Sequence, residues 1–345
     1  MSATINAKKI KFHVLGCGFE NTRNNSGDGF APFKYKCDYC AFDITSSYVW
    51  IVTKSGNVED RRIRKIDTST WREVHHPFEN VDVSSNYDIG LLTYIENTTS
   101  NLGVLVTDTD GIVVFDLTTD EIFCTINGTL WQINQKYYPH ATLVNDIIRV
   151  VGTTMNPSYY DAPYAVIDIT NGTYAQNTQA GGYTISGFYN DTDITLANRY
   201  FGDKKYVWGG RINSGAGLSQ LWGNPNYYPN VTLDSFASND YLYFPTHVGD
   251  TWQFGKYPIP PDVQTPSPID LMGINANTLV SPAVYTRGRT WASFLMSDNS
   301  LAVTDFRNYG ILYTSDSPKL TPKAMGDPWI LCDGSDGYTY IARYK

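Results

Sequence analysis

Val113-Val114-Phe115-Asp116-Leu117-Thr118 is a phrase that this sequence repeats: an apolar strand, an aspartate, an apolar residue and a turn. Related phrases are centred on Asp67, Asp168 and Asp305. Asp67 and Asp116 are 49 residues apart, and Asp116 and Asp168 are 52 apart. The 137 residues from Asp168 to Asp305 would hold two further copies at a similar period. A period of roughly 40–50 residues built from strands is typical of a β-propeller.

Seven apolar segments recur along the chain, as expected if each repeat is one small antiparallel sheet. The second strand of each sheet should be the most apolar, because neighbouring sheets cover both of its faces. The segments are Tyr48–Thr53, Gly103–Thr107, Ile147–Gly152, Tyr206–Gly210, Tyr241–Thr246, Trp291–Met296 and Tyr338–Tyr344. We therefore predict an all-β, seven-bladed β-propeller, with six or eight blades as the alternatives.

The two ends of the chain each lack part of a sheet. The segment Tyr338–Tyr344 has no third strand after it, and Lys9–Val14 has no second strand before it. We predict that these ends pair, so that residues 1–14 and 325–345 share one closing blade and residues 1–345 form a single domain. Such pairing removes the two exposed sheet edges that an open ring would leave.

The recurring aspartate has a structural explanation. Asp side chains accept hydrogen bonds from backbone N–H groups a few positions further along a turn. We therefore predict that Asp67, Asp116, Asp168 and Asp305 fix the turn that follows each strand. This role explains why the residue recurs with the period of the repeat.

The charge of the chain argues against one class of partner. The net charge is −8, whereas binding to nucleic-acid phosphates needs a basic face. The one basic cluster is Arg61, Arg62, Arg64 and Lys65. Strand alternation puts Arg62 and Arg64 on the side opposite Ile63, so we expect them on a solvated outer face.

We also expect no membrane insertion and no secretory signal. No segment approaches the roughly 18 apolar residues of a membrane span. The first ten residues contain no long apolar stretch. The expected location is therefore a virion, if the chain is viral, and otherwise the cytoplasm.

The chain is poor in charged residues and rich in polar uncharged ones. Charged residues make up 17% of the chain, below the roughly 25% typical of soluble domains, while aromatic residues reach 14%. Tyr, Asn, Thr and Gly solvate a surface by hydrogen bonding rather than by charge. This pattern suits extracellular or virion β proteins whose surfaces meet glycans or neighbouring subunits.

The five cysteines are not spaced like a disulfide framework, and we expect reduced thiols. Cys37 and Cys40 form a Cys-x-x-Cys pair that follows Cys17 and His13. The pair resembles half of a zinc knuckle, which a second Cys-x-x-Cys or a His pair would have to complete. We predict no metal and no cofactor, and whether these four residues bind a metal stays open.

The sequence offers no catalytic motif. A Gly-x-Ser-x-Gly nucleophile elbow does not occur. Ser335-Asp336-Gly337 has the wrong spacing for a sialidase turn. Glycosidases need two carboxylates about 5 to 9.5 Å apart around a pocket, and the sequence selects no such pair.

Aromatic pairs beside Asn and Pro mark two predicted loops. The candidate binding residues are Tyr159, Tyr160, Trp222, Asn224, Asn226, Tyr227 and Tyr228. Tyr in loops offers a rigid, amphipathic contact surface that suits sugar rings or a protein partner. The alternative is that these rings pack the interface between blades.

The repeated phrase, as at Ala165-Val166-Ile167-Asp168-Ile169-Thr170, resembles seven-bladed propellers of the quinoprotein-like superfamily. The resemblance implies the architecture only. Catalytic members of that superfamily bind a quinone cofactor, but no matching residue is found in this chain. The Asn-, Tyr- and Thr-rich, charge-poor composition also looks like that of bacteriophage tail or adaptor proteins, some of which use propellers as rigid platforms.

We predict a non-enzymatic binding or assembly module, a virion component such as a phage tail, adaptor or receptor-binding protein. Its loops would contact other virion proteins or a host-surface glycan, and it would join a higher-order oligomer in the assembly. One alternative is a carbohydrate-active hydrolase with paired carboxylates in the propeller channel. The other is an intracellular protein-interaction scaffold.

Overall fold

The computed structural model shows an all-β chain, which confirms the predicted class. It describes residues 14–16, 35–54, 58–81, 83, 90–108, 110–130, 133, 138–153, 162–179, 183–201, 204–223, 236–238, 241–248, 251–258, 270–271, 281–306, 309–314 and 318–344. Within these residues the helical content is two short 3₁₀ turns, η1 (Val58–Asp60) and η2 (Arg287–Arg289). In the described part of the chain, no helix has the length and apolar character needed to cross a membrane.

Five sheets have four strands each, and in most of them the strands pair antiparallel in chain order. The first two are β2 (Tyr39–Phe42), β3 (Tyr48–Thr53), β4 (Arg62–Asp67) and β5 (Arg72–Val74), then β6 (Leu92–Tyr94), β7 (Leu102–Thr107), β8 (Gly111–Asp116) and β9 (Ile122–Ile126). Two more are β18 (Phe236–Ser238), β19 (Tyr241–Val248), β20 (Thr251–Pro258) and β21 (Asp270–Leu271), then β22 (Val284–Tyr285), β23 (Ala292–Leu295), β24 (Ser300–Thr304) and β25 (Tyr309–Thr314). The fifth is β26 (Leu320–Met325), β27 (Trp329–Gly334), β28 (Thr339–Arg343) and β1 (Val14–Gly16).

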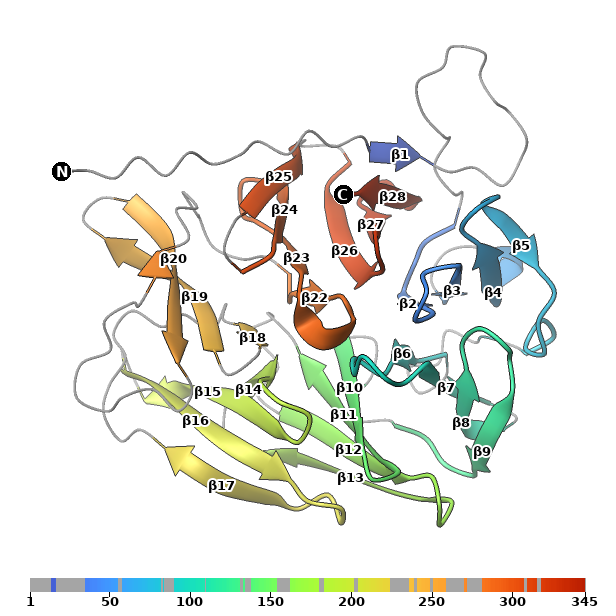
Figure 1. Cartoon of the computed structure of the whole chain (residues 1–345), viewed down its shortest axis with the longest axis horizontal. Helices are drawn as coiled ribbons and strands as arrows, with labels where there is room; N and C mark the ends of the chain where they lie inside the picture. The colour runs from blue at the N-terminus through green and yellow to red at the C-terminus, as the bar shows by residue number, and fades with distance from the viewer. Residues whose placement is uncertain are drawn as a thin grey trace.

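The remaining sheet has eight strands. Its first half is β10 (Tyr138–Val144), β11 (Ile147–Thr153), β12 (Ala162–Asp168) and β13 (Thr173–Gln179), and its second half is β14 (Tyr183–Phe188), β15 (Asp193–Phe201), β16 (Lys204–Ile212) and β17 (Leu218–Gly223). A single parallel residue pair, Thr153 with Ile185, joins the halves. Seven of the strands follow one path and curl into a half-barrel. Figure 1 shows this sheet below the centre of the molecule.

The two ends of the described chain meet in one sheet. Val14 pairs with Ala342 and Gly16 with Tyr340, so β1 lies antiparallel to β28 as the fourth strand. The expected placement of Tyr338–Tyr344 as a second strand is wrong, because β26 and β27 precede it and β26 already begins at Leu320. Most of the predicted strand Lys9–Val14 lies outside the described residues.

The apolar segments locate most second strands. Tyr48–Thr53 is β3, and β7, β11, β19 and β23 cover four of the other predictions. Tyr206–Gly210 is an exception, because it belongs to β16, the third strand of its group. The second strand there, β15, buries Asp193 and Thr195 among its apolar residues, so its sequence looks less apolar than its position.

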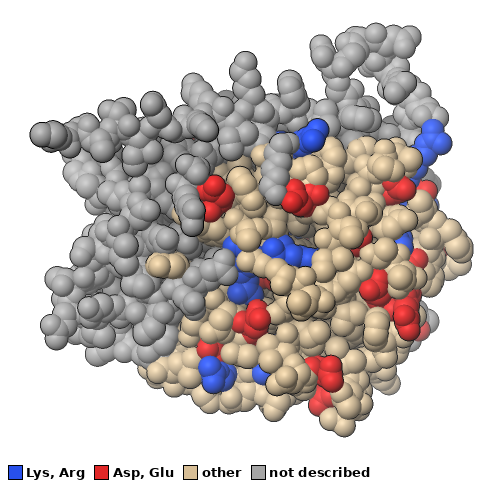
Figure 2. All heavy atoms as spheres, viewed as in Figure 1, with Lys and Arg blue, Asp and Glu red and all other residues tan. Residues whose placement is uncertain are grey.

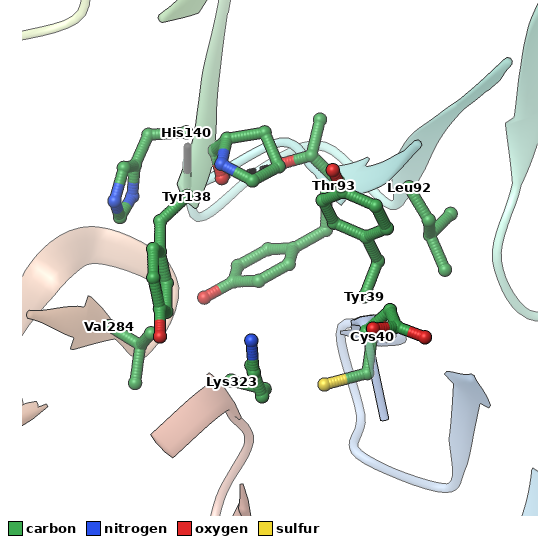
Figure 3. A pocket seen from close by; sticks show the side chains of 11 residues that line it. Tyr39, Cys40, Leu92, Thr93, Tyr138, His140, Val284 and Lys323 are labelled. Carbon is green, nitrogen blue, oxygen red and sulfur yellow. Dashed lines mark hydrogen bonds between the residues drawn. The ribbon is translucent and has the colours of Figure 1, made fainter. Parts of the chain in front are cut away.

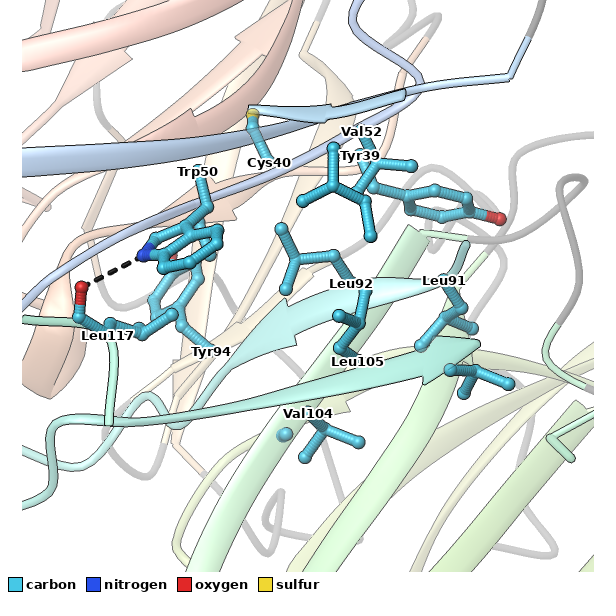
Figure 4. Close-up of a cluster of buried hydrophobic side chains, with 14 of the residues drawn as sticks. Tyr39, Cys40, Trp50, Val52, Leu91, Leu92, Tyr94, Val104, Leu105 and Leu117 are labelled. Atoms are coloured by element: carbon cyan, nitrogen blue, oxygen red, sulfur yellow. Dashed lines mark hydrogen bonds between the residues drawn. The ribbon is translucent and has the colours of Figure 1, made fainter. Parts of the chain in front are cut away.

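The core lies between facing sheets, as Figure 4 shows for the sheets that begin with β2 and β6. Trp50 on β3 is fully buried, and its indole N–H donates to the Leu117 carbonyl at 2.9 Å. The Trp50 and Phe115 rings pack edge to face with centroids 5.0 Å apart. The indole therefore fills the space between two sheets and also fixes their relative position.

Three of the four repeated aspartates, Asp67, Asp116 and Asp168, act as predicted. Asp67 accepts hydrogen bonds from the N–H groups of Ser69 and Thr70, Asp116 from those of Thr118 and Thr119, and Asp168 from that of Asn171, at 2.7–3.1 Å. The N–H of the residue after each of these three aspartates donates to the loop between the first two strands of its sheet: Thr68 to Ser47, Leu117 to Asn101 and Ile169 to Asp146. After Asp305 the Phe306 N–H donates to Thr304 Oγ1 at 2.9 Å instead. Residues 307–308, in the turn after Asp305, lie outside the described residues.

The basic cluster does not form a solvated face, so that expectation is wrong. Arg62 is exposed, but Arg64 is buried and donates to Thr53 Oγ1 at 2.9 Å. The Arg64 guanidinium also lies 3.8 Å from the centre of the Tyr35 ring, and burial lowers its pKa to about 10. Other parts of the chain cover both faces of β4, so Lys65 on the opposite face is buried as well.

Removing β1 should weaken its sheet. We expect a chain that lacks residues 1–16 to have a free energy of unfolding about 2–3 kcal/mol below that of a chain that lacks only residues 1–13, since each lost ladder hydrogen bond contributes about 1 kcal/mol net. Urea unfolding followed by tryptophan fluorescence measures the difference. Equal stability of the two truncated chains would contradict the pairing of β1 with β28.

Candidate functional site at the centre of the sheets

The first strands of several sheets lie next to one another at the centre of the molecule. β2 contacts β6 and β26, β6 contacts β10, and β22 contacts β26. Ile95, just after β6, and Ala141 in β10 form a parallel bridge, so these two strands run in the same direction. We call these first strands the inner strands. The residues that precede them lie together at one end, and the residues that follow them lie together at the other end. Figure 1 shows η2 in front of these strands, at the second end.

Residues 286–290, which we call the central plug, close this second end. The plug turns sharply because Gly288 and Arg289 both have left-handed backbone conformations, with φ of 68° and 51°. The Gly288 N–H donates to the Glu96 carbonyl at 2.7 Å. A Cβ on Gly288 would lie 2.5 Å from Thr98 Cγ2, so no larger residue fits this contact without movement.

Arg287 ties the plug to two other sheets. Its guanidinium donates to the carbonyls of Phe42 at 3.0 Å and Ser100 at 2.6 Å, and also to that of Ile95. The Tyr94 ring lies 5.2 Å away. Burial lowers the pKa of Arg287 to about 10, so the side chain stays cationic at neutral pH. Its guanidinium is therefore engaged by backbone carbonyl groups near the ends of β2 and β6.

Arg289 and His140 share one buried carboxylate, Glu96. Arg289 Nε lies 2.8 Å from one Glu96 oxygen, and His140 Nδ1 lies 2.6 Å from the other. The three residues are only 3–5% exposed. Burial is the largest influence on the pKa of Glu96 and raises it, but His140 and Arg289 together outweigh burial and lower the pKa. Glu96 is therefore an ionised structural link among the sheets of β6, β10 and β22.

An open hollow of about 220 Å³ lies beside the plug, at the ends of β2, β22 and β26. Trp291 and Tyr344 pack together in its wall with ring centroids 5.2 Å apart. Asp43 and Asp327 also line it. Figure 2 shows this face of the molecule, with Lys and Arg side chains gathered over η2 and acidic side chains around them. The hollow thus combines an aromatic wall with carboxylates and a buried guanidinium.

The carboxylate of Asp43 is already engaged. It accepts hydrogen bonds from the Tyr48 N–H at 2.9 Å, from Thr45 Oγ1 at 2.7 Å and from Thr118 Oγ1 at 2.8 Å. Asp43 is 1% exposed. These contacts make Asp43 part of the frame that holds neighbouring sheets together.

A smaller pocket of about 40 Å³ lies at the opposite end of the inner strands. Residues that open β2, β6, β10 and β22 line it, together with Lys323 of β26. Figure 3 shows Lys323 rising into the pocket, with Tyr138 and Val284 on one side and Cys40 on the other. The central plug and the Glu96 contacts separate this inner pocket from the outer hollow.

The candidate binding residues fall mostly outside the described structure. Tyr159, Tyr160, Asn224, Asn226, Tyr227 and Tyr228 are not among the described residues. Trp222 lies in β17, at one end of the path through the eight-stranded sheet, but its side chain is not described. A binding role for these residues stays a prediction.

The described cysteines are free thiols, as predicted. Cys37, Cys40 and Cys332 are buried, and Cys124 is partly buried. His13 and Cys17 lie outside the described residues. Among the residues that are described, no group of three or more His, Cys, Asp or Glu side chains is arranged to hold a metal ion.

Sequence reasoning missed the residues that build the centre: Glu96, His140, Arg287, Gly288 and Arg289. One signal was present, an Arg-Gly-Arg tripeptide directly after an apolar strand in a charge-poor chain. Two arginines around a glycine at a strand end fit a turn whose cations have buried partners.

Comparisons with known proteins support the fold class. No protein-family model matches the chain, and no curated protein matches it. Among solved structures, a similar one is the crystal structure of the computationally designed protein Ika8, a propeller-like protein. The two are 11% identical, with a TM-score of 0.50, and the match covers 91% of this chain and 98% of the designed one. At this identity the likeness concerns the fold alone.

Glu96→Gln should destabilise the protein by about 3–5 kcal/mol, because it leaves the buried Arg289 charge without its carboxylate. Urea unfolding at neutral pH measures the loss. Glu121→Gln removes one negative charge at an exposed position and serves as the control, with an expected change within about 0.5 kcal/mol.

Acid should remove the same stabilisation. The pKa of Glu96 is lowered in the folded protein, so its contribution is complete above the unfolded value of about 4.3 and is lost as the pH falls through the lower folded value. The stability gap between wild type and Glu96→Gln should therefore narrow on acidification below about pH 4. A gap that widens in acid would contradict the ion-paired state of Glu96.

Gly288→Ala should destabilise the protein by more than the backbone cost of placing Ala in a left-handed conformation. Gly172 has a similar φ of 61° with open space around it, so Gly172→Ala reports the backbone cost of about 1 kcal/mol. Gly288→Ala adds the clash with Thr98, and Thr98→Ser in the same chain should restore part of the loss. Thermal unfolding of wild type and these three variants measures this, and equal costs at Gly172 and Gly288 would contradict the tight contact.

Proposed function

We propose that the protein is a non-enzymatic binding and assembly module built on a closed seven-bladed β-propeller. Three observations support the architecture. The eight-stranded sheet consists of two four-stranded halves joined by one residue pair, so that the sheets supply seven blade-sized groups. β1 and β28 pair within one group, and the fold is similar to a designed propeller-like protein.

The observation that carries the functional proposal is the central plug. A propeller that acts on a substrate in its channel needs an accessible cavity with available polar groups. Here Arg287 and Arg289 fill the centre and bond to carbonyls and to Glu96. In this proposal the filled centre makes the propeller rigid, and the loops at its rim and on its two faces serve as contact surfaces.

The proposed partners follow from the composition. A surface rich in Tyr, Asn and Thr suits contact with neighbouring subunits or with a host-surface glycan. We propose Tyr159, Tyr160, Trp222, Asn224, Asn226, Tyr227 and Tyr228 as contact residues. In this proposal the protein is a virion component, such as a phage tail, adaptor or receptor-binding protein.

One observation favours the alternative, a carbohydrate-active hydrolase. Asp43 and Asp327 line the same hollow as Trp291, and an aromatic ring beside two carboxylates is common in glycosidases. The three hydrogen bonds to Asp43 weigh against a catalytic role for it. If the protein hydrolyses chromogenic glycosides and Asp327→Asn abolishes this activity, the hydrolase is the correct function and the binding-module proposal is wrong.

Purified particles from the source should contain this chain at a fixed stoichiometry to the other structural proteins. Quantitative peptide mass spectrometry of density-purified particles measures the ratio, and a detergent and salt wash distinguishes a built-in component from an adhering one. Absence of the chain from washed particles would contradict the virion role and leave the hydrolase and the intracellular scaffold.

A further inference from the structure

The inner pocket holds a cation without a contacting anion. Among the described residues, no oxygen lies within hydrogen-bonding or ion-pair distance of the Lys323 ammonium, whose one direct partner is the Tyr138 ring at 4.7 Å. Figure 3 shows the ammonium pointing into the pocket rather than out along β26. Lys323 is partly buried, and an ammonium withdrawn from water without a counter-charge in contact is costly.

Two of the other polar groups around the pocket already have a hydrogen-bond partner. The Thr93 hydroxyl donates to the Pro139 carbonyl at 3.1 Å, and Asp38 accepts the Lys54 N–H at 2.7 Å. The Tyr138 hydroxyl has no hydrogen-bond partner in the described part of the chain, so it can donate into the space beside Lys323. The pocket therefore presents the Lys323 ammonium and the Tyr138 hydroxyl as donors beside the Asp38 carboxylate, and the Tyr39 hydroxyl, which belongs to another lining residue, is buried without a partner among the described residues.

Nearby carboxyl groups keep Lys323 protonated without neutralising it at contact distance. Burial, the largest influence, lowers the pKa of Lys323, but the surrounding groups, which include the carboxyl groups of Asp333 and Asp38, together outweigh it and raise the pKa. Asp333 itself has a pKa raised to about 6 by burial, and its nearest cation is Lys36 at 3.9 Å. An anion that enters the pocket thus meets a charged ammonium.

The size of the pocket limits the occupant. A water molecule needs at least roughly 10–15 Å³ of such space, so the 40 Å³ here hold about three waters or one compact anion. We propose that the inner pocket binds a small monovalent anion, with Lys323 and Tyr138 as its ligands. A carboxylate group fits best, because its two oxygens can accept from the ammonium and the phenol separately.

This inference does not depend on the proposed function, since it concerns the end of the inner strands opposite the central plug. The carboxylate in the pocket could come from two sources that share the same chemistry: a free small acid, or an acidic side chain of a partner protein. Acetate and formate serve as probes for the first source, and an acetylated Asp amide serves for the second.

The test is thermal unfolding of the full chain in rising sodium acetate, with sodium sulfate substituted to hold the ionic strength constant. We expect saturable stabilisation of wild type and at least a tenfold weaker apparent affinity in Lys323→Met. Lys319→Met removes the same charge from an exposed position near the start of β26 and should bind like wild type. Tyr138→Phe, which deletes a single hydroxyl, should weaken binding several-fold.

A direct measurement covers the case in which Lys323→Met does not fold. Bromide line broadening in ⁸¹Br NMR should appear with wild type, decline as acetate is added, and be reduced in Tyr138→Phe. Broadening that acetate does not displace, or that is unchanged in Tyr138→Phe, would overturn the proposal. The absence of any saturable response in wild type would mean that water fills the pocket, and would overturn it as well.

Discussion

The carboxylate of Glu96 is the contact on which the centre of this protein depends. It sits in the interior with Arg289 on one oxygen and His140 on the other, so three sheets meet at one ionised group. Such a group is tolerated only while both partners stay in place, since an unpaired buried charge costs several kcal/mol. The position of each sheet is therefore coupled to the others through a few atoms.

The periphery is organised by a different and more local rule. Asp67, Asp116 and Asp168 each cap the turn after a strand, and the following N–H reaches the loop between the first two strands of the same sheet. Side chains such as Trp50 then link one sheet to the next through single hydrogen bonds. Local repeats thus build similar sheets, and the unique residues in the middle hold them in register.

This division explains what the sequence could predict. The strands of β3, β7 and β11 and the aspartate turns depend on residues close together in the chain, so their patterns are visible in it. The contacts of the central plug leave no such local pattern, because Arg289 and its partner Glu96 are 193 residues apart in the sequence. The burial of Arg64 was missed for a related reason: alternation along one strand does not show what covers its second face.

The pairing of β1 with β28 also sets how the molecule would carry a mechanical load. Val14 faces Ala342, so the chain leaves both strands at the same end of the pair. Tension applied between the two termini would pull the strands apart one hydrogen bond at a time, as a zipper opens, instead of shearing the whole ladder at once. A load through the termini would thus open this seam at low force, whereas a load through the faces of the sheets would leave it closed.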